Sequence, residues 1–259
     1  MTNSKRYSVL TFIFGGYEKV REISVIDPDA EYILVTDDPG LKSSTWEVIC
    51  DSRLENMGII DRCYYVRYHP FEYCHTDICF KIDGSIQVKE SLSGIIDSFE
   101  EKRADMMVML NPMHTRLHED YRRWVKTRGY GQDDACRAMK ILKRLGYSRF
   151  YRGYYQICVS IERKNKHTSD FDSITYNLLR YMGKDGAIER FDQPVYSFVL
   201  NSLFSDRMNV MPVQETLITN SKYLQWCIHN SDEAIPMKKK MKRPFLFNRL
   251  ADCVDFSLK

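Results

Sequence analysis

The segment from Asp77 to Ile86 places the strongest constraint on what this chain can fold into. Its first residues are mostly β-branched or aromatic, as in a strand, and they lead into Asp83, Gly84 and Ser85. In open α/β sheets, ligands collect outside the carboxyl ends of strands, so a carboxylate there is well placed to meet a cation or a sugar hydroxyl. An Asp-Gly pair between apolar residues is also a hairpin signal, because glycine accepts positive φ. The segment alone leaves both interpretations open.

Strand-like runs and stretches of helical spacing follow one another along the rest of the chain. With 44% hydrophobic and 28% charged residues, the composition is that of a soluble globular protein with a full core. The further predicted strands are 7–14, 31–36, 46–50, 105–110 and 153–161. Helices are expected at 58–68, 91–102 and 118–145, the last broken near 129–131. We expect one α/β domain, residues 1–215, on which a helical and basic C-terminal segment, residues 216–259, packs.

Apolar residues at helical spacing mark the helix faces expected to be buried. They are Ala135, Ala138, Met139, Leu142 and Leu145, then Ile174, Leu178, Tyr181 and Met182, then Val195, Phe198, Val199 and Leu203. Asp192 and Pro194 suit the start of the last of these helices, with Asp192 as its N-cap.

Two loops that follow predicted strands carry residues suited to a nucleotide. Gly15, Gly16 and Tyr17 come directly after the first strand, where glycines let the backbone approach a ligand closely. No phosphate-loop motif is present, and a plain tight turn is the alternative. Asp37 follows the second strand and could hold a ribose or a base, although acids are also common in turns. Arg62, on a predicted helix, is a candidate partner for a diphosphate or simply an exposed arginine.

The charge distribution bears on partners. A formal net charge of +3 is too small to indicate nucleic-acid binding, which we do not expect. Basic residues interleaved with apolar ones do cluster near the C-terminus, and such a segment could rest on anionic lipid. A solvated basic tail is the plainer interpretation. The basic members are Lys238, Lys239, Lys240, Lys242, Arg243 and Arg249.

The cysteines and the hydropathy pattern bear on location. The eight cysteines include no Cys-x-x-Cys pair, and no secretory leader precedes them, which predicts reduced thiols. No run approaches the roughly 18 apolar residues of a membrane span. We expect a cytoplasmic protein, with peripheral contact at the inner face of the membrane.

The order of these signals resembles that of the GT-A glycosyltransferases. Between residues 7 and 204 the chain reads strand-Gly-Gly-Tyr, strand-Asp-Asp, strand-Asp-Gly-Ser, strand-Asn-Pro-Met-His, Gly-Tyr-Tyr-Gln and Asp-Gln-Pro. It is similar in particular to a bacterial polysaccharide-type group, related to a plant glycosyltransferase-like family, that carries W-[IL]-D-G in the place of the D-x-D metal motif. The resemblance implies a GT-A (Rossmann-like) mixed sheet flanked by helices.

The resemblance also implies which residues meet the substrates. With Arg62 and Lys81 added as basic candidates, the residues expected on the nucleotide sugar are Thr11, Gly15, Gly16, Tyr17, Asp37, Arg62, Lys81 and Gly84. The family's H-P-x-R, G-L-Y-E and R-D-Q segments are similar to 111–114, 153–156 and 191–193. In these segments Asn111 replaces histidine, His114 replaces arginine and Gln156 replaces a carboxylate. The expected acceptor or sugar contacts are Asn111, His114, Gln156 and Gln193.

Cleavage of a bond between a sugar and a diphosphate builds negative charge on the leaving group, which a cation must offset. The candidate ligands of a divalent cation, Mn²⁺ or Mg²⁺, are Asp83, Ser85 and a late histidine, His229. Binding without a divalent cation, through Arg62 and Lys81, is the rival expectation.

The expected function is therefore sugar transfer from a nucleoside diphosphate donor, a UDP-sugar in particular, to a saccharide or lipid-linked saccharide in surface polysaccharide synthesis. The expected catalytic residues are Asp83 and Asp192, with Asp192 as the base if the reaction inverts configuration. The alternative is a catalytically silent nucleotide- or carbohydrate-binding protein of the same fold. It stays open because a second acid near Asp83 is missing and because Asn111 and Gln156 depart from the family pattern.

Overall fold

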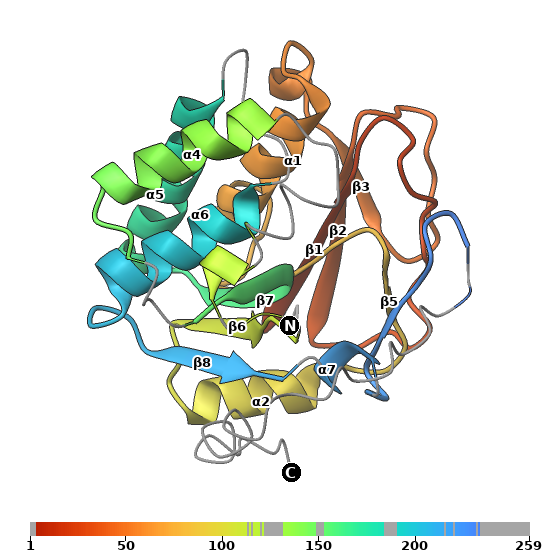
Figure 1. Cartoon of the computed structure of the whole chain (residues 1–259). Coiled ribbons are helices and arrows are strands. Elements are labelled where there is room, and N and C mark those ends of the chain that lie inside the picture. Colours follow the sequence, from red (N-terminus) through yellow and green to blue (C-terminus); the bar gives the residue numbers. More distant parts are fainter. Residues whose placement is uncertain are drawn as a thin grey trace.

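The computed structural model describes residues 4–112, 114, 116–119, 121, 132–148, 153–183, 191–214, 216–219, 221–231 and 233. The described residues form a seven-stranded, mostly parallel sheet with helices on both faces and a second sheet of two strands (Figure 1). The α/β fold expected from the sequence is therefore confirmed, and it is compatible with a Rossmann-like arrangement. None of the described helices has the length and apolar character needed to cross a membrane.

The main sheet has the strand order β3-β2-β1-β4-β7-β6-β8. Strand β7 is antiparallel to both of its neighbours, β4 and β6, and the other neighbouring pairs are parallel. The strands are β1 (Tyr7–Ile13), β2 (Ala30–Thr36), β3 (Glu47–Cys50), β4 (Ile78–Ile82), β6 (Met106–Leu110), β7 (Tyr155–Arg163) and β8 (Val210–Val213). The second sheet pairs β5 (Ile86–Val88) with β9 (Leu224–Trp226) in antiparallel fashion.

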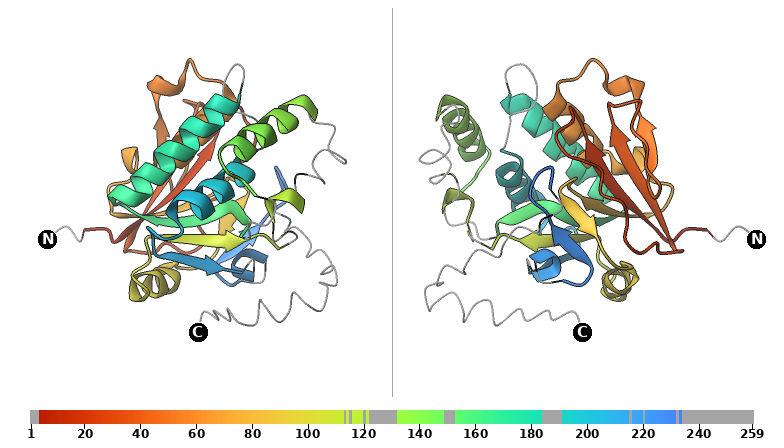
Figure 2. Two further views of the ribbon diagram at one scale, coloured as in Figure 1. Left: turned by 60° about the vertical axis from the view of Figure 1, so that its left-hand side comes forward. Right: turned by 90° about the vertical axis from the view of Figure 1, so that its right-hand side faces the viewer.

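Alternating side chains of the strands fill two hydrophobic cores, one on each face. In β1, Val9 and Ile13 pack on the face covered by α2 (Ser93–Glu101) and α7 (Thr216–Thr219). Leu10 and Phe14 pack on the opposite face, toward α1 (Ile59–Tyr68). That face also carries α4 (Gln132–Arg144), α5 (Lys166–Met182) and α6 (Asp192–Val199), as Figure 2 shows. Short helical turns η1 (Ser52–Leu54) and η2 (Pro70–Glu72) join the early elements, and α6 continues into the π-helical turn η3 (Leu200–Phe204).

Successive strands are added on one side of β1 first and then on its other side, where β4 lies. From β1 the chain proceeds through β2 to β3 on one side, and then returns to place β4 on the other side of β1. The connections that leave the carboxyl ends of β1 and β4 therefore diverge, and such a switch point is where open α/β sheets bind ligands. Residues 14–18 and 83–85 follow these two ends.

The Asp83-Gly84 pair does not form a hairpin. Strand β5 leaves β4 and pairs with β9 instead, and Gly84 is absent from the glycines with positive φ. The reason for a glycine at 84 is close packing: an added Cβ would lie 2.9 Å from Ile13 Cγ1 and 3.5 Å from Glu18 Cβ. Asp83 therefore lies at the end of β4, as expected, and the hairpin interpretation is wrong; contact of Asp83 with a ligand stays a prediction.

Several residues expected in the core lie at the surface. Ala138, Met139 and Leu142 are buried as predicted, while Leu145, which follows the end of α4, is 54% exposed. In α5, Met182 is buried as predicted and Leu178 packs partly buried against the core. Ile174 and Tyr181 are exposed, because the buried face of α5 runs through Phe171, Tyr176 and Leu179 instead. Leu203 lies in the π-helical turn and is 43% exposed, because the wider turn rotates it off the buried stripe of α6. The burial of Ala135 lies outside the described residues.

Candidate active site at the carboxyl edge of the sheet

The glycine loop after β1 is tied to the end of β2. The Gly15 N–H donates to both carboxylate oxygens of Asp37, at 2.9 and 3.1 Å. Arg62 of α1 donates to the same carboxylate at 2.8 Å, and its other nitrogens donate to the carbonyls of Met57 and Glu55. Asp37 and Arg62 thus bind each other and shape the loop, and direct contact of either with a nucleotide stays a prediction.

Asp83, at the end of β4, forms an ion pair with Arg67 of α1. The guanidinium of Arg67 also donates to the carbonyl of Ile157 in β7 at 2.5 Å and lies 5.1 Å above the ring of Phe12 in β1. Burial opposes its charge, but the nearby acids, Asp83 foremost, outweigh burial and raise the pKa of Arg67. Three strands and one helix therefore hold a permanent cation beside Asp83. The sequence reading did not select Arg67, although it lies one helical turn and a residue beyond the chosen Arg62.

Asp192, at the start of α6, lies near the ion pair of Asp83 and Arg67. It is the first residue of the helix rather than its N-cap, which is Phe191, and its Oδ1 accepts from the Gln193 N–H at 3.0 Å. Burial raises the pKa of Asp192, Arg67 lowers it, and Asp83 raises it further. The three groups lie close enough to affect one another electrostatically, although Asp83 and Asp192 are 109 positions apart by number. Asp83 and Asp192 are therefore electrostatic neighbours, and their joint role in catalysis stays a prediction.

Lys81 does not reach this edge. Its side chain is 2% exposed, and its ammonium forms an ion pair with Glu162 of β7, donates to the Arg67 carbonyl at 3.0 Å and lies 3.9 Å from Asp172 of α5. The reason is the alternation of β4, which turns Lys81 toward the helical layer, like Cys79. The expectation that Lys81 contacts a nucleotide is corrected: in this structure it is an interior residue.

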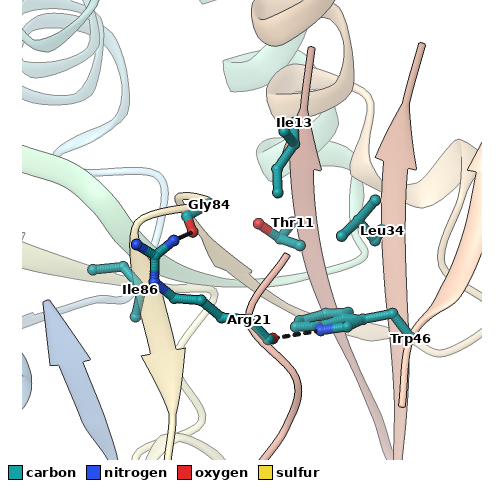
Figure 3. A pocket seen from close by; sticks show the side chains of 7 residues that line it. All are labelled: Thr11, Ile13, Arg21, Leu34, Trp46, Gly84 and Ile86. Carbon is teal, nitrogen blue, oxygen red and sulfur yellow. Dashed lines mark hydrogen bonds between the residues drawn. The ribbon is translucent and has the colours of Figure 1, made fainter. Parts of the chain in front are cut away.

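Thr11 is also interior. It lines a small cavity with room for about one water molecule (Figure 3). The Thr11 hydroxyl is buried and hydrogen bonds to no described residue, so a buried water is its expected partner. At 3% exposure Thr11 is not placed to contact a nucleotide, contrary to the expectation. The lining residues are Thr11, Ile13, Arg21, Leu34, Trp46, Gly84 and Ile86.

A polar cluster that sequence reasoning missed joins the glycine loop to the segment after β9. The buried Arg21 donates to Glu18 at 2.7 Å, to the Gly84 carbonyl at 2.7 Å and to the carbonyl of Ser231 at 2.9 Å. Glu18 in turn contacts Nδ1 of His229, whose Nε2 lies 3.0 Å from the Tyr17 hydroxyl. The predicted residues Tyr17, Gly84 and His229 are therefore in one cluster. The sequence did not indicate this cluster, because Glu18 and Arg21, three positions apart in a loop, match no known motif.

Three of the four residues expected on the acceptor side, Asn111, His114 and Gln193, are linked by hydrogen bonds, and Gln156 lies near the start of β7. Asn111 follows β6, its Nδ2 lies 3.4 Å from Gln193 Oε1, and its Oδ1 accepts from the His114 N–H at 3.0 Å. Gln156 lies across from Met109 in the β6–β7 pairing, and its buried Oε1 has no described hydrogen-bond partner. These amides therefore border the carboxyl edge next to Asp192. Their contact with a sugar stays a prediction.

The residues expected to hold a divalent cation do not fit one. Arg67 already binds one oxygen of Asp83, Ser85 is 4% exposed, and both nitrogens of His229 have protein partners. Mg²⁺ and Mn²⁺ need several oxygen-rich ligands, whereas this set offers one acid that is already paired. Within the described part of the chain, no three His, Cys, Asp or Glu side chains are grouped to hold a metal.

No protein-family model and no curated protein matches this chain.

Proposed function

We propose that the protein is a glycosyltransferase of the GT-A class that moves a sugar from a nucleoside diphosphate donor, a UDP-sugar in particular, to a saccharide or lipid-linked saccharide. One observation carries the proposal. Asp83 and Asp192 converge with Arg67 at the switch point between β1 and β4, beside the glycine loop. This is the place where open α/β sheets bind ligands, and it holds both acids expected in catalysis.

The glycine loop is the proposed contact for the pyrophosphate. Gly15 and Gly16 have φ of +65° and +64°, and successive backbone N–H groups in such a conformation form concave anion sites. The Gly15 N–H is used by Asp37, while the exposed Gly16 N–H has no partner among the described residues. A phosphate oxygen accepting from Gly16 would lie on the same edge as Asp83.

Asp83 is the proposed contact for a hydroxyl of the donor. Its Oδ1 binds Arg67, its Oδ2 accepts from no described residue, and the side chain is 35% exposed. A fixed, half-paired carboxylate can accept a hydrogen bond from a hydroxyl without being drawn away from its position.

Asp192 is the proposed base. In an inverting transfer, the acceptor oxygen forms a bond to the anomeric carbon while the bond from that carbon to the diphosphate oxygen breaks. The bonding electrons leave with the diphosphate, and the acceptor hydroxyl proton passes to the Asp192 carboxylate. A carboxyl whose pKa is raised by burial is a stronger base than an exposed one, which suits this role. If configuration is retained, Asp192 holds the acceptor instead.

The catalytically silent alternative differs from this proposal in one observable. Both functions involve ligand binding at this edge, but only a transferase breaks the bond between the donor's sugar and its diphosphate. The cytoplasmic location and the peripheral membrane contact also stay predictions, because the basic cluster between Lys238 and Arg249 lies outside the described residues.

A donor screen followed by a release assay tests the proposal. Thermal shift with a panel of nucleotide sugars should identify one or a few that stabilise the protein, and that donor should then release its nucleoside diphosphate on incubation with the protein. Asp192→Asn should lower release at least about 100-fold while keeping donor binding, since it removes the base but not the binding edge.

Asp206→Asn is the matched control, because Asp206 is exposed and lies in the connection that precedes β8. Binding of a donor without release would support the silent alternative. Absence of stabilisation by any nucleotide sugar would contradict the transferase and would leave, of the alternative, only a protein that binds carbohydrate.

A further inference from the structure

We propose that donor binding and transfer at this site require no divalent cation, because Arg67 is the resident cation beside Asp83. The inference rests on the proposed function and specifies the chemistry of the same site.

The carboxylate of Asp83 is already paired and is not a free metal ligand. A GT-A site that depends on a metal needs free acids, yet here one oxygen of this carboxylate is in an ion pair with Arg67. A divalent ion bound to the other oxygen would lie within a few ångström of the guanidinium charge, and the two cations would repel each other strongly at that distance. The nearest candidate co-ligands, Ser85 and His229, are respectively buried and already partnered.

Contacts from several elements hold the guanidinium of Arg67 in one orientation. Its guanidinium is fixed by Asp83, by the Ile157 carbonyl and by the ring of Phe12, which come from three adjacent strands. Its Nε is buried and has no described partner. A cation that is pre-oriented in this way offsets developing charge without reorganising, which is the function a metal would otherwise serve. Arginine also keeps its charge at any physiological pH.

The carboxyl edge carries charges of both signs. Arg67 offsets the charge of Asp83, and a second acid, Asp192, lies close to both. Among the described residues, Arg67, Arg62 and the Gly16 N–H are positive groups at this edge that a diphosphate would meet. Arg67 acts as a positioning residue for Asp83 and as the electrostatic partner of the leaving group.

Two measurements on the full chain test this inference. The first is titration of UDP, or of the donor found by the screen, into the protein by calorimetry, once with EDTA and once with Mn²⁺. The expected result is the same affinity in both buffers within about twofold. The second is electron paramagnetic resonance of Mn²⁺ added to the protein with and without UDP. The expected spectrum is that of Mn²⁺ that the protein does not bind.

Variants separate a role in the site from a role in folding. Arg67→Met should lower UDP affinity about tenfold or more, as expected for loss of a charged partner. Arg67→Lys, which keeps the charge, should retain part of that affinity and serves as the second variant if Arg67→Met does not fold. Arg163→Met is the matched control, since Arg163 also stacks on a phenylalanine, Phe99, but lies at the end of β7 away from the site.

The outcomes are distinguishable. Affinity or release that disappears in EDTA and returns with Mn²⁺ would overturn the inference and leave the proposed function intact. Mn²⁺ binding that Asp83→Asn abolishes would overturn it as well, whatever the activity. Absence of nucleotide binding in both buffers would contradict the proposed function, and the inference would fall with it.

Discussion

Burial alone would lower the pKa of Arg67, and the two acids beside it, Asp83 and Asp192, help to outweigh that effect. The same balance sets the behaviour of Asp192. Burial raises the pKa of this acid, and Arg67 counteracts part of that effect. The residue trio is thus one electrostatic unit, in which changing one member changes the others.

This coupling predicts a shift in the pH dependence of transfer. Asp192 must be ionised to act as a base, so the rate should fall as the pH drops through its raised pKa. Arg67→Gln removes the cation that lowers this pKa, and the acid limb of the profile should therefore move to higher pH. The measurement is kcat against pH for the wild type and Arg67→Gln.

Arg163→Gln is the control for that profile, because Arg163 also stacks on a phenylalanine but lies at the end of β7 away from the site. An acid limb that stays in place in Arg67→Gln would show that Asp192 is not the titrating base.

A second buried unit, Lys81 with Glu162 and Asp172, belongs to stability rather than to the site. Burial raises the pKa of Asp172 well above its usual range, and the neighbouring Glu162 raises it further. Both effects favour the neutral form of Asp172, which reduces the uncompensated charge in the interior.

Substitutions in this unit should differ sharply. Lys81→Met leaves Glu162 without its counter-charge and should lower the free energy of unfolding by about 3–5 kcal/mol. Asp172→Asn replaces one neutral group by another of similar shape and should cost about 1 kcal/mol or less. Urea unfolding at neutral pH measures both. Equal costs for the two variants would mean that Asp172 is charged.

At the scale of the elements, the turn after β4 is placed by packing against the loop after β1. Gly84 lies against Ile13 and Glu18, and its carbonyl accepts from Arg21. The Arg21 guanidinium also reaches the segment after β9, so three connections far apart in sequence meet there. The edge of the sheet is rigid because these connections hold one another.

Gly84→Ala should disturb this meeting point. Its Cβ would come within 2.9 Å of Ile13 Cγ1, and overpacking of this kind costs about 1–3 kcal/mol of stability. Gly58→Ala is the matched control, because nothing lies within 4 Å of its added Cβ. Thermal unfolding of both variants compares them. An unchanged midpoint for Gly84→Ala would contradict the close packing of this turn.

Patterns within short stretches of sequence predicted several helices and strands well. They did not predict which side chains form hydrogen bonds and ion pairs with one another. The strand that ends at Asp83 follows from its β-branched and aromatic composition, and the helix that contains Arg62 and Arg67 begins within a residue of its predicted start. Which arginine of that helix meets Asp83 depends on how α1 packs over β1 and β4, and spacing within the helix does not contain that information. Lys81 was misplaced for a similar reason, because its counter-charges come from β7 and α5.

At the scale of the whole molecule, the site is a consequence of topology. The order of the strands creates a switch point between β1 and β4, and the long return of the chain through β7 and α6 brings Asp192 to the same edge. The order of motifs along the sequence predicted that these segments converge. It did not predict the cluster of Glu18, Arg21 and His229, since those residues are brought together only by the pairing of β5 with β9.

Amide chemical-shift mapping by NMR during titration with UDP tests the central claim most directly. UDP should shift the amides at the carboxyl edge, at residues 14–18, 37–38, 83–85 and 192–193, and it should shift them equally in EDTA. Shifts that gather elsewhere, or no shifts at any UDP concentration, would contradict the claim.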